Sequence, residues 1–143
     1  MDKNRLKKDL SASLRQVPSV LAAYLFGSTA AGIEREGSDV DIAVYLDEKL
    51  NSSRMMEVRF HLLDIFGSLY DREVDVVVLN RASLKMIHQV LYHGELIYDR
   101  DPERTLAFAL QRQKEYFDFK YYIDKDIQQM RTFFGCQDRG DNP

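Results

Sequence analysis

The chain has 143 residues, of which 45% are hydrophobic and 30% are charged, so it is long enough for an ordinary globular domain with a hydrophobic core. Its net charge of −3 provides no positive field for nucleic acid, and its one cysteine, Cys136, excludes a disulfide framework. Without a run of about 20 apolar residues or an apolar stretch in the first residues, we expect a protein of the reducing cytoplasm, outside membranes.

Hydrophobic spacing predicts helices that alternate with short apolar strands. Leu6, Leu10 and Leu14 have the spacing of an amphipathic helix, and Asp101-Pro102-Glu103 is typical of a helix start. In chain order, we expect helix 3–15, strand 20–26, a short helix from residue 28, strand 39–46, a helix ending near residue 67, strand 73–79, helix 82–93, strand 95–98, and a long helix from 102 to 134.

This alternation indicates an α/β (α+β) fold with a mixed sheet flanked by helices. The pairing of the first two strands stays open at this point. We expect a single domain over 1–134, with a core over 17–100 and a C-terminal helix over 102–134. The tail 135–143 contains Gly, Asp and Asn, and we expect it to be disordered.

Two carboxylates open the strand expected at 39–46. Asp39 and Asp41 are two residues apart, so on a strand they point to one face while their apolar neighbours point to the other. Adjacent carboxylates repel each other and lose solvation beside a core, so they need a compensating charge. A divalent cation that carries a polyphosphate would supply it.

Three further residues extend this candidate site. Gly27 allows the backbone to approach a ligand closely, and Ser28 offers a hydroxyl at a helix N-terminus, where free N–H groups favour phosphate. Asp75 heads the next apolar strand and would lie beside Asp39 and Asp41 if the two strands are neighbours. Three carboxylates can hold two Mg²⁺ ions about 3.5–4 Å apart, which suits an in-line displacement at phosphorus.

The spacing Gly27-Ser28-x10-Asp39-x-Asp41 resembles the signature of the DNA polymerase β-like nucleotidyltransferase superfamily. The short chain is similar to the minimal nucleotidyltransferase (MNT) branch, the antitoxin half of type VII-like HEPN/MNT toxin–antitoxin pairs. The resemblance is specific over residues 24–46 and extends through Asp75. It implies a mixed sheet flanked by helices, as the spacing of apolar residues also indicates.

The resemblance also implies a reaction. In that family AMP passes from ATP, with Mg²⁺ and with release of pyrophosphate, to a hydroxyl such as that of tyrosine on the partner toxin, an all-helical RNase. Carried over by position, Gly27 and Ser28 hold the triphosphate, and Asp39, Asp41 and Asp75 hold two metal ions. We therefore expect a protein adenylyltransferase that forms a hetero-oligomer with a HEPN toxin and neutralises it by AMPylation, without direct nucleic-acid binding.

The turn after Gly27-Ser28 departs from the family pattern. Many relatives have an arginine there, whereas this chain has Thr29-Ala30-Ala31. We take Arg35 as the candidate that replaces the missing contact to phosphate.

Two other functions remain open on the sequence alone. A binding-only antitoxin would occlude the toxin through helix 102–134 without catalysis. A small-molecule nucleotidyltransferase, similar to the aminoglycoside-modifying enzymes, would generally need an additional acceptor-binding domain, and only about 45 residues follow strand 95–98.

Several of these residues also have a purely structural interpretation. Asp75 could cap its strand or pair with Arg72. His88 and His93 are five residues apart on a predicted helix, but no third ligand accompanies them, so we expect packed or exposed histidines.

The long C-terminal helix is rich in aromatic side chains. Apolar residues on more than one side of a helix indicate burial against two neighbours, here the sheet and a partner, although packing in the chain's own core is the open alternative. The aromatic residues are Phe108, Tyr116, Phe117, Phe119, Tyr121, Tyr122, Phe133 and Phe134.

Overall fold

The computed structural model describes residues 3–27, 40–69 and 73–135. The helix expected after Gly27 and the tail 136–143 lie outside these residues. The elements are α1 (Lys3–Leu14), β1 (Val20–Phe26), β2 (Val40–Leu46), α3 (Ser52–Leu69), β3 (Val74–Val78), the 3₁₀-helix η1 (Leu79–Arg81), α4 (Leu84–His93), β4 (Glu95–Asp99) and α5 (Pro102–Phe133).

Four strands form one mixed sheet with the order β3-β2-β1-β4. β1 is antiparallel to β2 and to β4, and β2 is parallel to β3. A parallel pair needs a crossover connection, which α3 provides between β2 and β3. The expected mixed sheet is confirmed, and β3 forms one open edge of it.

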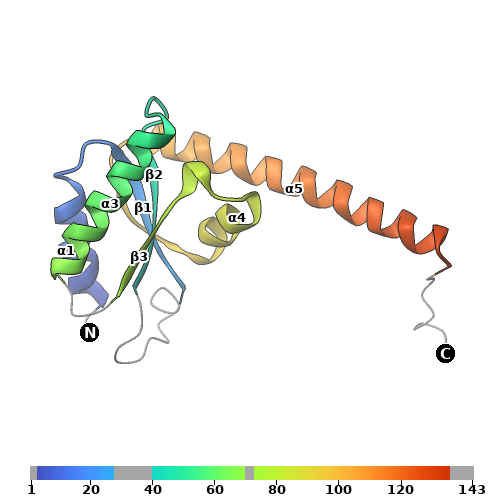
Figure 1. The fold of residues 1–143 in the computed structure, drawn as a ribbon, viewed down its shortest axis with the longest axis horizontal. Helices are drawn as coiled ribbons and strands as arrows, with labels where there is room; N and C mark the ends of the chain where they lie inside the picture. Colours follow the sequence, from blue (N-terminus) through green and yellow to red (C-terminus); the bar gives the residue numbers. More distant parts are fainter. Residues whose placement is uncertain (1–2, 28–39, 70–72, 136–143) are drawn as a thin grey trace.

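Helices cover both faces of the sheet (Figure 1). α1 and α3 cover one face, and α4 and the first half of α5 cover the other. On the first face the buried helix residues are Leu6, Leu10, Leu14, Met55, Leu62 and Phe66. On the second face they are Ile87, Val90 and Phe108.

The alternation of side chains along β2 decides where the acidic site lies. Val40, Ile42, Val44 and Leu46 all pack in the core under α1 and α3. Ala43 and Tyr45 pack in the core under α4 and α5. Since Asp41 is two residues before Ala43, it lies on the α4–α5 face, as the period of two predicts.

Helix α3 buries three of its residues and leaves other large apolar side chains exposed. Its buried residues are Met55, Leu62 and Phe66, whereas Met56 and Phe60 are 45% and 54% exposed. The helix expected to end near residue 67 is confirmed, and it lies beside the edge strand β3. The Asn51 side chain accepts a hydrogen bond from Arg54 N (2.9 Å) and caps this helix.

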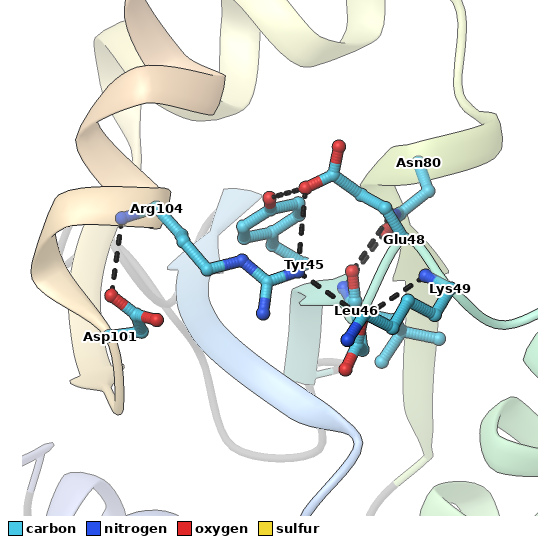
Figure 2. A network of polar contacts seen from close by, with 8 residues as sticks. Tyr45, Leu46, Glu48, Lys49, Asn80, Asp101 and Arg104 are labelled. Atoms are coloured by element: carbon cyan, nitrogen blue, oxygen red, sulfur yellow. Dashed lines mark hydrogen bonds and ion pairs between the residues drawn. The ribbon is translucent and has the colours of Figure 1, made fainter.

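A polar network attaches the start of α5 to the end of β2 (Figure 2). Arg104 Nη2 lies 3.2 Å from Asp47 Oδ1 and 3.6 Å from Glu48 Oε1. Beside it, the ring of Phe108 stacks on Tyr45 with centroids 4.2 Å apart. Backbone N–H donation from Lys49, followed by the Arg104 contact, holds the pKa of Asp47 below its usual value. The network sets the direction in which α5 leaves the sheet.

The second half of α5 extends away from the rest of the molecule (Figure 1). From Phe117 to Phe133 every residue of the helix is exposed. Burial of the whole helix in the chain's own core is therefore excluded, since only Thr105 and Phe108 are buried in it. Among the described residues, α5 included, no helix is long and apolar enough to cross a membrane.

Candidate active site

Strand register brings three of the predicted residues together at one end of the sheet. Phe26 of β1 faces Asp41 of β2, and Asp41 faces Asp75 of β3. Gly27 follows Phe26 directly. Residues opposite each other on adjacent strands point to the same face and lie about 4.8 Å apart, so the carboxylates of Asp41 and Asp75 are neighbours.

Gly27 is required here by both its backbone and its surroundings. Its φ of +75° lies in the left-handed region, which side-chain-bearing residues rarely adopt. A Cβ atom at Gly27 would lie 2.4 Å from Oδ2 of Asp41, which is closer than two such atoms can approach. The absence of a side chain therefore leaves room for the carboxylate, and the turn and the acidic strand form one unit.

Asp75 lies at the open edge of the sheet, and its side chain is 59% exposed. Arg59 of α3 reaches around this edge: its Nε donates to the Val76 carbonyl oxygen (2.7 Å), and its Nη2 lies 3.5 Å from Asp75 Oδ1. The arginine partner of Asp75 in the structure is therefore Arg59 of α3. Arg72, the partner considered from the sequence, lies outside the described residues. No sequence pattern pointed to Arg59, because tertiary packing alone joins two residues 16 positions apart.

Three of the predicted site residues, Ser28, Arg35 and Asp39, lie outside the described residues. Their expected roles stay predictions.

The donors at this site suit a hard cation. Asp41 and Asp75 offer only carboxylate oxygens, the ligand type that Mg²⁺ prefers together with phosphate oxygens and water. Within residues 3–27, 40–69 and 73–135, no group of three or more His, Cys, Asp or Glu residues could hold a metal ion. Asp39 would be the third carboxylate of such a group.

The two histidines that were considered as a metal pair are not at this site. His88 Nδ1 lies 2.7 Å from Gln113 Oε1, and its ring stacks on Tyr116 with centroids 4.0 Å apart. His93 is exposed at the end of α4. His88 therefore packs α4 against α5, as the structural interpretation predicts.

Two clefts lie at different distances from the carboxylates. A cleft of about 280 Å³ runs along β3 and includes Asp75 and Arg59 in its lining. A larger one of about 460 Å³ lies between η1, α4 and α5, where Asn80 and Arg112 contribute to its lining. The larger of these two clefts is at the opposite end of the strands from Asp41 and Asp75, and the smaller one adjoins the acidic site.

The sequence model of the family described as "Polymerase beta, Nucleotidyltransferase" matches residues 8–103, which is more than half of the chain. The chain belongs to this nucleotidyltransferase family. The matched segment includes β1 with the Gly27 that follows it, and the strands that carry Asp41 and Asp75.

Among related nucleotidyltransferases, the protein adenylyltransferase MntA of Shewanella oneidensis is 31% identical over 90 residues, which are 63% of this chain and 62% of MntA. The match thus spans less than two thirds of that relative. The fold is similar to a crystal structure described as a toxin–antitoxin with AMP-PNP (TM-score 0.68, 27% identity, 91% of this chain and 98% of the other). It is also similar to the toxin–antitoxin MntA-HepT (TM-score 0.64, 25% identity, 87% and 95%). The resemblance to minimal nucleotidyltransferases and the predicted fold are confirmed.

Proposed function

We propose that this nucleotidyltransferase transfers AMP from ATP to a tyrosine hydroxyl of a HEPN toxin and thereby neutralises the toxin. The observation that carries the proposal is the pairing of Asp41 with Asp75, next to the Gly27 turn. Similarity to the protein adenylyltransferase MntA and to a toxin–antitoxin described with AMP-PNP supports the choice of AMP and of a toxin as partner.

Each predicted residue has a role in this reaction. Gly27, Ser28 and Arg35 would hold the triphosphate through backbone N–H groups, a hydroxyl and a guanidinium. Asp39, Asp41 and Asp75 would hold two Mg²⁺ ions. When bound, these ions supply charge neutralisation at the triphosphate and at the reacting oxygens.

The transfer itself is an in-line displacement at the α-phosphorus of ATP. A bond forms between the acceptor oxygen and the α-phosphorus, and the bond from that phosphorus to the oxygen shared with the β-phosphorus breaks. Pyrophosphate leaves on the side of Gly27, and the acceptor's proton passes to the Asp75 carboxylate and then to solvent. The neighbouring positions of Asp41 and Asp75 support this assignment, because one side chain can serve the nucleotide and the other the acceptor.

The second half of α5 supports a protein partner. Thr105, Phe108, Arg112 and Tyr116 form the face of α5 toward the sheet and α4, and successive members are three or four positions apart. The same spacing continues in the exposed residues Phe119, Ile123, Ile127, Met130 and Phe134, which we call the distal stripe. An apolar stripe that continues a packed helix face suits a helical partner, as an all-α toxin would be.

This exposed stripe also favours the second candidate, an antitoxin that acts by binding alone. In that case the toxin would be inhibited whether or not AMP is transferred. The two functions differ in what they require of Asp41 and Asp75, since occlusion through α5 needs neither carboxylate.

Labelled ATP separates the two candidates. The protein is incubated with α-³²P-ATP, Mg²⁺ and its HEPN toxin. We expect label on the toxin, no label when Mg²⁺ is chelated, and at least about a hundredfold slower labelling by Asp41→Asn or Asp75→Asn, because each removes a charge from the reacting centre. Asp64→Asn, an exposed carboxylate of α3 outside the site, is the control for the same change in charge.

Unchanged labelling in Asp41→Asn and Asp75→Asn would contradict the assigned site. Toxin inhibition without any transfer of label would support the binding-only antitoxin. Toxin RNase activity, measured in the same samples, reports inhibition.

A further inference from the structure

The cleft along β3 has a carboxylate at one end and an arginine at the other. It lies between α3 and η1, and its lining includes Asp75, Arg59 and Arg81. Three strand steps separate Asp75 from Val78, the end of β3, which is about 10 Å. The cleft therefore extends from the acidic site along the open edge of the sheet.

The floor of this cleft is apolar. Met55 and Met56 come from α3, Val77 from β3 and Ala82 from the segment after η1. Thioether and branched side chains of this kind pack well against the edge or face of an aromatic ring. At about 280 Å³, the cleft is smaller than the pockets of about 300–1,000 Å³ that hold drug-sized ligands, and it suits a single large side chain.

The two arginines give the cleft a positive rim. Arg59 Nε donates a hydrogen bond to the Val76 carbonyl oxygen, and Arg81 Nη1 donates one to the Ser52 hydroxyl. A guanidinium has five N–H donors, so each arginine keeps donors for a carboxylate of a ligand. The β3 edge is covered at Val76 by Arg59, so a ligand would bind here through its side chains.

In-line geometry decides which reactant this cleft serves. The strand order places Gly27, Asp41 and Asp75 in sequence across the sheet, with the cleft beyond Asp75. If the pyrophosphate leaves from the Gly27 side, the attacking hydroxyl enters from the opposite side of the phosphorus. The opposite side is the Asp75 side, where the cleft begins.

We propose that this edge cleft is the acceptor site, and that it takes a tyrosine with an acidic residue about three positions away in the acceptor chain. This inference rests on the proposed function. The tyrosine ring lies on Met55, Met56 and Val77 with its hydroxyl beside Asp75, and the acidic residue pairs with Arg81. The transfer step is the one given above, with the tyrosine oxygen as nucleophile and pyrophosphate as leaving group.

Peptide binding tests the charge of the rim without requiring catalysis. Fluorescein-labelled nine-residue peptides with a central tyrosine carry either glutamate or lysine three positions before and after it, and anisotropy reports their Kd. We expect the glutamate peptide to bind at least about tenfold more tightly, and Arg81→Glu to reverse this preference. Arg54→Glu, an exposed residue of α3 outside the cleft, makes the same change in net charge and should retain the wild-type preference.

Equal affinity of the wild-type protein for both peptides would overturn the proposal. An equal loss of the preference for the glutamate peptide in Arg81→Glu and Arg54→Glu would also overturn it. Arg81→Glu that raises the KM for ATP while leaving peptide affinity unchanged would also overturn it, because the cleft would then serve the nucleotide. A wild-type protein that binds the glutamate peptide but never labels the toxin would refute the proposed function alone.

A second pair of variants tests the apolar floor. Met56→Ala should lower the affinity for the tyrosine peptide severalfold. Phe60→Ala should leave this affinity unchanged, because Phe60 is an exposed apolar residue of α3 outside the cleft. Replacing the peptide's tyrosine by serine should weaken binding to the wild-type protein to a similar extent. Equal affinities for the tyrosine and serine peptides would contradict the aromatic part of the proposal.

Discussion

At the scale of single residues, the site depends on Gly27 having no side chain. The Gly27 backbone lies so close to Asp41 that a Cβ would overlap the carboxylate oxygen. The residue is also held at φ +75°, where alanine is strained by about 1–2 kcal/mol. Gly27 thus contributes both to the turn after β1 and to the position of the Asp41 side chain.

Gly27→Ala should therefore impair catalysis more than stability. We expect a loss of about 1–2 kcal/mol in the free energy of unfolding, measured by urea titration, and at least about tenfold slower AMP transfer because the Asp41 carboxylate must move. Gly67→Ala is the control, since a Cβ there meets nothing within 4 Å on helix α3 and should raise stability by about 0.5–1 kcal/mol. Equal transfer rates in the two variants would contradict the role of Gly27.

At the scale of elements, α5 has two halves with one continuous face. The first half packs on the sheet and α4 through Phe108 and Tyr116, and the polar network at Arg104 fixes where it begins. The second half carries the distal stripe, whose members are 40–66% exposed. Because the spacing does not change between the halves, we propose that the second half packs on the surface of the partner in the same way.

A charge in the distal stripe should weaken partner binding without unfolding the protein. Ile127 is 43% exposed, so Ile127→Glu should leave the free energy of unfolding within about 0.5 kcal/mol. We expect its Kd for the HEPN toxin, measured by calorimetry, to rise at least about tenfold. Gln129→Glu adds the same charge on the opposite side of the helix and should bind as the wild type does. Equal effects of the two substitutions would exclude the distal stripe as the contact.

At the scale of the whole molecule, two tyrosines in the core under α4 and α5 limit stability at high pH. Burial, followed by the charge of Asp99, raises the pKa of Tyr24 to about 12. Burial and then the hydrogen bond to Glu48 raise the pKa of Tyr45 as well. The folded state therefore favours the neutral phenols, and this stability is complete below pH 10 and is lost as the pH rises through about 12. The pKa of Asp47 is lowered, so the contribution of this residue to stability is lost as the pH falls below 3.8, the usual pKa of an aspartate.

Urea titrations at pH 8, 10 and 12 should show that the free energy of unfolding falls at high pH. A shift from 10 to about 12 in the pKa of Tyr24 corresponds to about 2 kcal/mol of stability lost at pH 12. Tyr24→Phe removes the hydroxyl that titrates. The free energy of unfolding of this variant should therefore fall by about 2 kcal/mol less than that of the wild type between pH 10 and 12. An identical loss in the wild type and the variant would show that Tyr24 is not the group that titrates.

The sequence by itself determined the helices and strands and most of the described site. Periodicity is local, so the spacing of Leu6, Leu10 and Leu14 and the alternation in β2 predicted these elements correctly. The spacing of Gly27 and Asp41 predicted that they belong together, and Asp75 was expected beside them if its strand is a neighbour. The structure makes β3 the neighbour of β2, with Asp75 opposite Asp41 and Gly27 directly after β1.

Only the tertiary structure decided what depends on neighbours from distant parts of the chain. It placed β2 between β1 and β3, joined Arg59 to Asp75 around the sheet edge, and turned Met56 toward the cleft instead of the core. It also showed where α5 loses contact with the sheet and α4. An apolar residue on a helix is equally suited to a core, a cleft or a partner, and only the position of the sheet separates these possibilities.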